Sequence, residues 1–142
     1  MPGRKPWMPR EREVLRSVMQ ALDALGCMPT RRNIRNDPIS FPDGTPALDD
    51  RGRPKYARSE LSGLPDVSAT IPKLGTRLEV EVKAYPNRPT PLQYRRLDEF
   101  NRVGALAVWV NDIEWLIWAV EHFKKGAKTR VDRDGESVVF YP

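Results

Sequence analysis

Two acidic residues and a lysine stand at spacings that could support metal-dependent chemistry on a phosphate. Glu81 and Lys83 belong to a strictly alternating segment, 76–83, so in a strand their side chains project from one face. Asp66 begins the preceding strand-like segment, 66–71, and the Pro-Lys-Leu-Gly that follows it predicts a turn. A four-residue turn at this point sets Asp66 directly opposite Glu81, with Cβ atoms about 5 Å apart.

Two carboxylates in direct opposition repel each other, and a purely structural role does not favour that arrangement. A divalent cation between Asp66 and Glu81 removes the repulsion, because oxygen atoms are the ligands that Mg²⁺ takes. Lys83, on the same face, could then meet a negatively charged reactant. The simpler interpretation is the solvated face of a sheet, with the odd-numbered polar residues from Arg77 to Lys83 outward and the intervening apolar residues in the core.

The elements that must position these residues alternate between helix and strand, which predicts an α/β fold with a mixed β-sheet flanked by helices. Residues 1–9 read as a flexible tail, and residues 10–142 as a single domain with a loop or insertion at about 36–58, rich in Pro, Gly and Asp. Apolar spacing and turn residues predict helices over 9–26, 90–104 and 112–123, strands over 66–71, 76–83 and 105–110, and a hairpin over 131–141.

Composition excludes several classes of protein and of site. The chain has 142 residues and lacks an 18-residue apolar run, so no transmembrane helix is expected, and its first residues lack the apolar stretch of a secretory signal. Cys27 and His122 are the single residues of their types, which excludes an internal disulfide and a His/Cys zinc cage. We therefore expect a cytoplasmic protein with no membrane partner and no organic cofactor.

The net charge of +5 lies wholly in the first part of the chain. Residues 1–58 hold 12 basic and 7 acidic side chains, whereas residues 59–142 hold 12 of each, and the surplus is mostly arginine. Arginine's planar fork suits phosphate, so nucleic acid is a reasonable partner. A solvated basic face that keeps the protein soluble explains the same count equally well.

Five sequence elements, taken in order, resemble a known nuclease family. Gly-Leu-Pro-Asp at 63–66 followed by Glu-Val-Lys at 81–83 resembles the PD-(D/E)xK nuclease signature, and the closer likeness is to the virus-type replication-repair nuclease domain, VRR-NUC. The remaining matching elements are Arg-Asn at 32–33, Arg-Pro-Thr-Pro-Leu-Gln at 88–93 and the apolar run at 104–110. The resemblance implies a restriction-endonuclease-like core.

The resemblance also implies roles for individual residues. Asp66, Glu81 and the carbonyl of Val82 would ligate Mg²⁺ or Mn²⁺, and Lys83 would steady the attacking water or the developing charge. The leading-helix glutamate of the family would be Glu11, because it lies on the predicted apolar stripe of the first helix and Glu13 points to the opposite face. A first-turn acid that complements the helix dipole is the structural alternative for Glu11.

Gln93 resembles the family's glutamine near the metal, and it also completes a capping box with Thr90. These two roles do not exclude each other. Tyr94 and Arg95, one turn into the same helix, could touch DNA or form ordinary helix surface. The residues that we expect to contact DNA are Arg31, Arg32, Asn33, Arg35, Tyr94 and Arg95.

The resemblance to small members of this family implies that the protein is a homodimeric Holliday-junction resolvase. Such a protein would be of phage or bacterial origin and would act on DNA near the nucleoid. Two symmetric nicks across a four-way junction need two equivalent sites related by a two-fold axis. Trp109, Trp115 and Trp118 stand in apolar runs and suit either the core or such a dimer interface. The alternatives are a nuclease for flaps or other branched DNA and a catalytically silent DNA-binding module of the same fold.

Overall fold

The structure is a computed structural model, and it describes residues 8–32, 38–56, 62–126, 128–131 and 138–141. The chain divides into two compact units. The larger unit combines residues 1–32 with residues 63–142, and the smaller unit comprises residues 33–62. The candidate site residues that the structure describes all belong to the larger unit.

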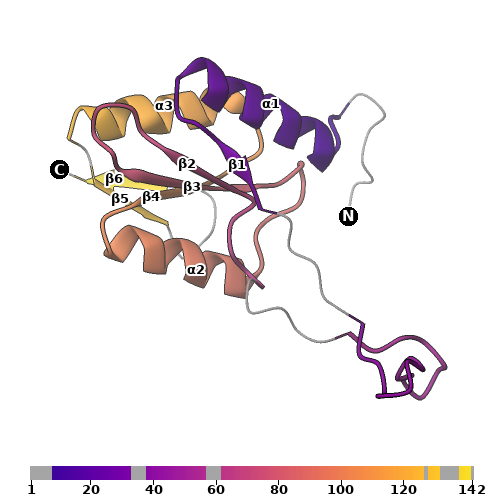
Figure 1. The fold of residues 1–142 in the computed structure, drawn as a ribbon. Helices are drawn as coiled ribbons and strands as arrows, with labels where there is room; N and C mark the ends of the chain where they lie inside the picture. The colour runs from indigo at the N-terminus through magenta and orange to yellow at the C-terminus, as the bar shows by residue number, and fades with distance from the viewer. Residues whose placement is uncertain (1–7, 33–37, 57–61, 127, 132–137, 142) are drawn as a thin grey trace. The chain divides into compact units, whose positions relative to one another are not determined.

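A four-stranded mixed sheet forms the centre of the larger unit (Figure 1). Its strands lie in the order β1 (Thr30–Arg31), β2 (Val67–Thr70), β3 (Arg77–Val82) and β4 (Leu106–Val110). β1 and β3 both pair antiparallel with β2, and β4 runs parallel to β3. The predicted α/β class and mixed sheet flanked by helices are therefore confirmed.

The register of the β2–β3 hairpin agrees with the pairing predicted from turn length. Val67 lies opposite Val80, and the Ile71 N–H donates to the Thr76 carbonyl at 2.8 Å, which closes the four-residue turn. One step beyond Val67, the same register brings Asp66 beside Glu81. A shift of one residue would have moved every side chain of β3 to the opposite face.

Three helices cover the two faces of the sheet. α2 (Pro91–Arg102) connects the parallel strands β3 and β4 and packs on one face, as parallel pairing requires of a crossover element. α1 (Glu11–Ala24) and α3 (Ile113–Lys124) pack together on the other face (Figure 1). Thr90 and Asp112 cap α2 and α3 through hydrogen bonds from the amides three residues on.

β3 is buried on both faces, which corrects the interpretation of its polar face as solvated. Leu78, Val80 and Val82 join the main core beneath α1 and α3, while Glu79 and Glu81 are 0% and 1% exposed on the α2 side. The helix after β3 covers the face that alternation alone assigned to water.

The core under α2 is smaller than the main core. Leu97 and Ala107 are fully buried there, and Tyr94, Phe100 and Trp109 pack around them. The apolar spacing of α2 places Val103 on the same stripe as Leu97, but Val103 follows the last helical turn and is 82% exposed.

Two further segments complete the described chain. β5 (Lys128–Val131) and β6 (Val138–Tyr141) pair antiparallel as a separate two-stranded sheet, and the predicted turn of this hairpin lies outside the described residues. In the smaller unit, the expected loop folds back on itself through isolated bridges, including Pro38–Tyr56 and Leu48–Pro54. Among the helices of the described ranges, none has the length and apolar character needed to cross a membrane.

Candidate metal-binding site

The site forms where β2 begins and β3 ends. Asp66 precedes the first residue of β2, Glu81 is the penultimate residue of β3, and Lys83 follows its last residue. The Val82 N–H donates to Asp66 Oδ2 at 2.8 Å, so the main chain of β3 fixes the Asp66 carboxylate. Hairpin pairing thus brings together the three residues that sequence spacing had singled out.

The two oxygens of the Glu81 carboxylate have different surroundings. Oε1 accepts a hydrogen bond from Gln93 Nε2 at 2.7 Å and lies 3.1 Å from Lys83 Nζ. Oε2 is also buried, and no described residue donates a hydrogen bond to it. A buried carboxylate oxygen without a partner is costly, so this atom points to a proton or a cation as its complement.

Burial dominates the electrostatics of both carboxylates. It raises the pKa of Glu81 to about 8, with the nearby Asp66 charge as the second cause, and the Lys83 ammonium opposes the shift. Burial also raises the pKa of Asp66, against the lowering effect of the hydrogen bond from Val82. Without a bound cation, the pair therefore favours a state that retains a proton.

The donor chemistry of this pair fits Mg²⁺ or Mn²⁺. A divalent cation beside Oε2 would supply its missing partner, and it would favour ionisation of Glu81 and Asp66 together. The described residues contain no group of three His, Cys, Asp or Glu side chains close enough to hold a metal. Side-chain ligation at this site would therefore come from two carboxylates, with main-chain oxygen or water completing the coordination.

Gln93 completes the predicted capping box and also contacts Glu81. Its Oε1 accepts from the Thr90 N–H at 2.8 Å, and its own N–H donates to Thr90 Oγ1 at 3.3 Å, which completes the capping box. Its Nε2 donates to Glu81. One amide side chain thus fixes the start of α2 and the orientation of a candidate ligand.

Glu11 and Glu13 are both exposed at the start of α1, but their surroundings differ. Glu11 precedes the buried stripe of Val14 and Val18, and its charge contributes to the raised pKa of Glu81. Glu13 instead accepts a hydrogen bond from the Arg10 N–H at the start of α1. Glu11 therefore lies near the carboxylate pair, although it does not form a three-carboxylate cluster with it.

The residues expected to contact DNA have diverse environments. Arg31 is exposed on β1, and its charge partly opposes the burial that raises the pKa of Asp66; Arg95 is exposed on α2. Tyr94 packs in the small core beneath α2. Asn33 and Arg35 lie outside the described residues.

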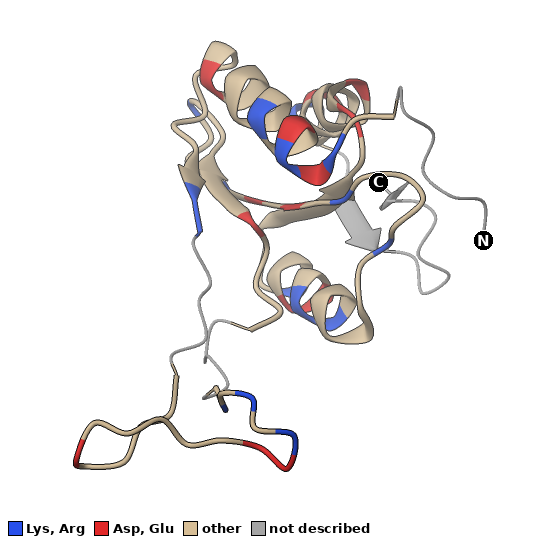
Figure 2. Ribbon diagram, turned by 90° about the vertical axis from the view of Figure 1, so that its right-hand side faces the viewer, with Lys and Arg blue, Asp and Glu red and all other residues tan. Residues whose placement is uncertain are grey.

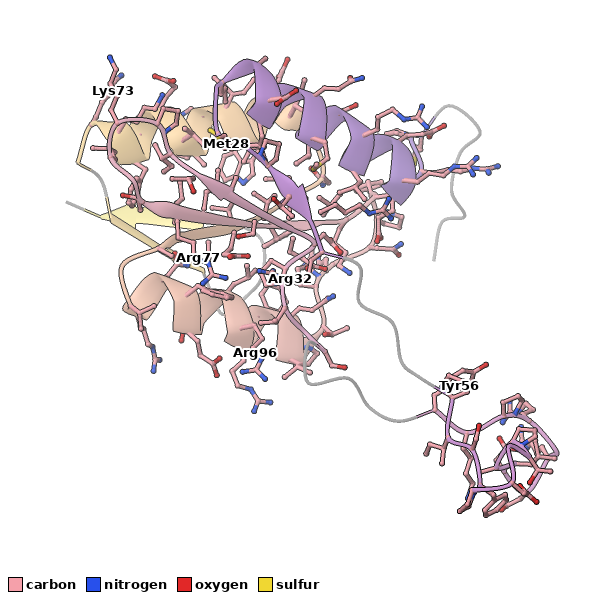
Figure 3. The ribbon with its side chains drawn as sticks, viewed as in Figure 1. Met28, Arg32, Tyr56, Lys73, Arg77 and Arg96 are labelled. Carbon is pink, nitrogen blue, oxygen red and sulfur yellow. The ribbon has the colours of Figure 1, made fainter. Side chains whose placement is uncertain are left out.

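Arg32 differs from the other predicted DNA contacts because its guanidinium points inward. It lies between the sheet and α2, as does Arg77 (Figure 3). Nη1 donates to Glu79 Oε2 at 2.9 Å and to the Pro65 carbonyl at 2.6 Å, and Nη2 lies 3.3 Å from Glu79 Oε1. These contacts occupy the planar fork that was expected to meet a phosphate.

Sequence reasoning missed Glu79 as a buried charge. The carboxylate accepts hydrogen bonds from Arg32, Arg77 and Ser68, the last at 2.9 Å from the hydroxyl. Its position two residues before Glu81 on the alternating strand was the available signal, since both side chains project from the same face. A buried carboxylate requires paired cations, and two arginines supply them here.

Comparisons with known proteins identify no relative of this chain. No protein-family model matches the chain, and neither the curated proteins nor the solved structures contain a match.

Proposed function

We propose that this protein is an endodeoxyribonuclease that uses Mg²⁺ or Mn²⁺ to hydrolyse phosphodiester bonds. The observation that supports the proposal best is the Glu81 carboxylate, which is 1% exposed, has one oxygen without a described partner, and lies beside Asp66 and Lys83. Desolvation of two adjacent carboxylates lowers stability unless something compensates it. Perturbed groups of this kind are concentrated at functional sites.

Each residue has a chemical role in this proposal. Bound Mg²⁺ or Mn²⁺ would polarise the scissile phosphate and lower the pKa of a coordinated water. Asp66 and Glu81 would hold the cation, with the Val82 main chain fixing Asp66 and Gln93 fixing Glu81. Lys83, whose side chain is 13% exposed, would stabilise negative charge that develops on the phosphate.

Branched DNA is the proposed substrate, and a homodimeric Holliday-junction resolvase of the cytoplasm is the specific form. The resemblance to VRR-NUC domains supports this choice, together with the net charge of +5. A protein that recognises the shape of a junction needs phosphate contacts more than base contacts. Two protomers would supply the paired sites that symmetric nicking requires.

Cleavage of defined DNA substrates tests the proposal. Labelled four-way junction, flap, single-stranded and linear duplex DNA are each incubated with the protein in Mg²⁺, Mn²⁺ or excess EDTA. We expect cleavage with either cation, none in EDTA, and a preference for the four-way junction. Cleavage in EDTA would contradict the metal mechanism, whereas a preference for flaps would retain the nuclease and replace the resolvase.

A further inference from the structure

Asp66 lies at the end of the strand pairing, next to a turn that the pairing does not hold. β2 begins one residue later, at Val67, and the preceding residues form a turn. The main-chain N–H of Arg32 donates to the Asp66 carbonyl at 2.7 Å, which continues the β1–β2 pairing by one residue, and the Arg32 guanidinium donates to the Pro65 carbonyl at 2.6 Å.

The other end of this restraint is the buried Glu79 carboxylate. Both terminal nitrogens of Arg32 contact it, and the ion pair is nearly closed to solvent, with side-chain exposures of 16% and 0%. Glu79 projects from the same face of β3 as Glu81. One guanidinium therefore connects the turn that carries one candidate metal ligand to the strand that carries the other.

We propose that Arg32 is a positioning residue of the metal site, and that it sets Asp66 opposite Glu81 rather than contacting DNA. The inference rests on the proposed metal-dependent function. The planar guanidinium is required, because it directs N–H groups to a carboxylate and to a carbonyl at the same time. A lysine at this position retains the charge but cannot reproduce the fork.

Arg77 offers a matched control. Its Nε contacts the same Glu79 carboxylate, its guanidinium stacks 4.8 Å from the Phe100 ring, and its side chain is 54% exposed. The contacts described for Arg77 do not include the Pro65–Asp66 turn. Arg32→Lys and Arg77→Lys therefore alter the same ion-pair cluster, but only the first removes a side-chain contact with the Pro65 carbonyl.

The experiment measures Mn²⁺ binding by calorimetry on the full chain without DNA, alongside steady-state cleavage. We expect Arg32→Lys to weaken Mn²⁺ affinity about tenfold, a typical effect for residues that orient metal ligands. We expect Arg77→Lys to change it less than about twofold. In cleavage, Arg32→Lys should lower kcat and leave the KM for DNA unchanged.

The outcomes separate this inference from the proposed function. Equal Mn²⁺ affinity in wild type and Arg32→Lys, with a raised KM for DNA, would overturn the positioning role and make Arg32 a phosphate contact. Absence of both Mn²⁺ binding and cleavage in the wild type would overturn the proposed function, and the inference with it.

If thermal melting shows that Arg32→Lys is unfolded, the double variant Arg32→Gln/Glu79→Gln replaces it. Two neutral amides leave no buried unpaired charge, so folding should be retained. The turn still loses its guanidinium, and the same weakening of Mn²⁺ affinity is expected. Wild-type affinity in the double variant would overturn the inference.

Discussion

The environment of Glu81 contains interactions that favour opposite protonation states. Lys83 and Gln93 contact Oε1 and stabilise the ionised carboxylate, whereas burial and the Asp66 charge stabilise the protonated one. Burial is the largest of these effects, so the metal-free protein retains a proton here at neutral pH. A divalent cation would compete with that proton, and binding would release it.

Neutral replacements of the carboxylate pair test the ligands directly. Asp66→Asn and Glu81→Gln retain the size of each side chain and remove its charge, so each should lower cleavage about 10³-fold or more while the fold persists. Cleavage assays in Mg²⁺ and circular dichroism of each variant provide the measurements. Full activity of either variant would exclude a mechanism based on two carboxylates.

The raised pKa of Glu81 predicts how the stability of the metal-free protein depends on pH. Because the folded pKa is about 8 and the ordinary value is 4.5, the folded state binds more protons than the unfolded state between these values. The free energy of unfolding should therefore fall as pH rises through this window, by up to about 1.4 kcal/mol per pH unit. The pKa of Asp66 is also raised and acts in the same direction.

Urea unfolding in EDTA at several pH values between 5 and 8 measures this slope. Glu81→Gln should flatten this slope. In the wild-type protein, Mg²⁺ should restore the free energy of unfolding that is lost near pH 8. A wild-type free energy of unfolding that increases from pH 5 to pH 8 would contradict the assigned burial of Glu81.

Glu11 and Glu13 form a natural pair of variants. Glu11→Gln should lower activity at least about tenfold, because the negative charge of Glu11 near the Asp66–Glu81 pair would help to hold a divalent cation. Glu13→Gln should leave activity nearly unchanged, because that carboxylate caps α1. Initial cleavage rates at saturating Mg²⁺ provide the comparison, and the reverse order of effects would show that Glu13 is the residue nearer the metal.

At the scale of elements, local rules were sufficient for the β2–β3 hairpin. Side-chain alternation and a four-residue turn fix the register, and that register brings Asp66 beside Glu81. The cap of α2 also followed from one residue, Thr90. The candidate carboxylate pair could therefore be predicted because it depends on contacts between neighbours in sequence.

Other features depend on contacts that no local pattern encodes. β1 has only two residues, which is too short to show a period. Arg32 and Glu79 lie 47 residues apart in sequence, and only their ion pair reveals that one arginine of the basic surplus faces inward. The same limit led to the solvated-face interpretation of β3, since alternation does not indicate that α2 covers that face.

The turn before β2 packs tightly against α2, and Gly63 makes this approach possible. Gly63 has φ +79°, and a Cβ atom at this position would lie 2.5 Å from Leu92 Cγ. Gly63→Ala should therefore combine backbone strain with a steric clash and lower the free energy of unfolding by about 2–5 kcal/mol. Denaturant unfolding provides the measurement.

Gly75 is the matched control for this prediction. Its φ is +67°, but a Cβ atom there would have no neighbour within 4 Å. Gly75→Ala should cost only the backbone strain, about 1–2 kcal/mol. Equal losses in the two variants would show that the turn does not depend on its close contact with Leu92.

At the scale of the whole molecule, part of the basic surplus is neutralised internally. Arg32 pairs with Glu79, a carboxylate from the later part of the chain, whereas the Arg53–Asp49 pair lies within residues 1–58 and is already counted in their surplus. Figure 2 shows basic and acidic residues interspersed along α1 and α2. One positive charge of that surplus is therefore compensated inside the fold, and a modest number of phosphate contacts is expected.

Phosphate contacts confer affinity without reading sequence, so DNA binding should depend on salt and on shape. Binding of the Asp66→Asn variant to a four-way junction should weaken steeply between low and physiological salt, and it should exceed binding to linear duplex of the same sequence. Fluorescence anisotropy at a series of salt concentrations measures both properties. Equal affinity for junction and duplex would remove the argument for a branched substrate.

Assembly tests the proposed resolvase against the alternative proposal of a nuclease for flaps or other branched DNA. Trp115 and Trp118 stack on α3 with ring centroids 4.8 Å apart, and Trp118 is 39% exposed, which makes this helix face a candidate for the expected dimer contact. Light scattering of the free protein should then give twice the mass of one chain, and strand-by-strand mapping should give two nicks related by symmetry. Trp118→Glu should yield monomers that nick only one strand of each junction. A wild-type monomer that nicks one strand, without preference for junctions, would leave the nuclease in place and favour flaps or other branched DNA as its substrate.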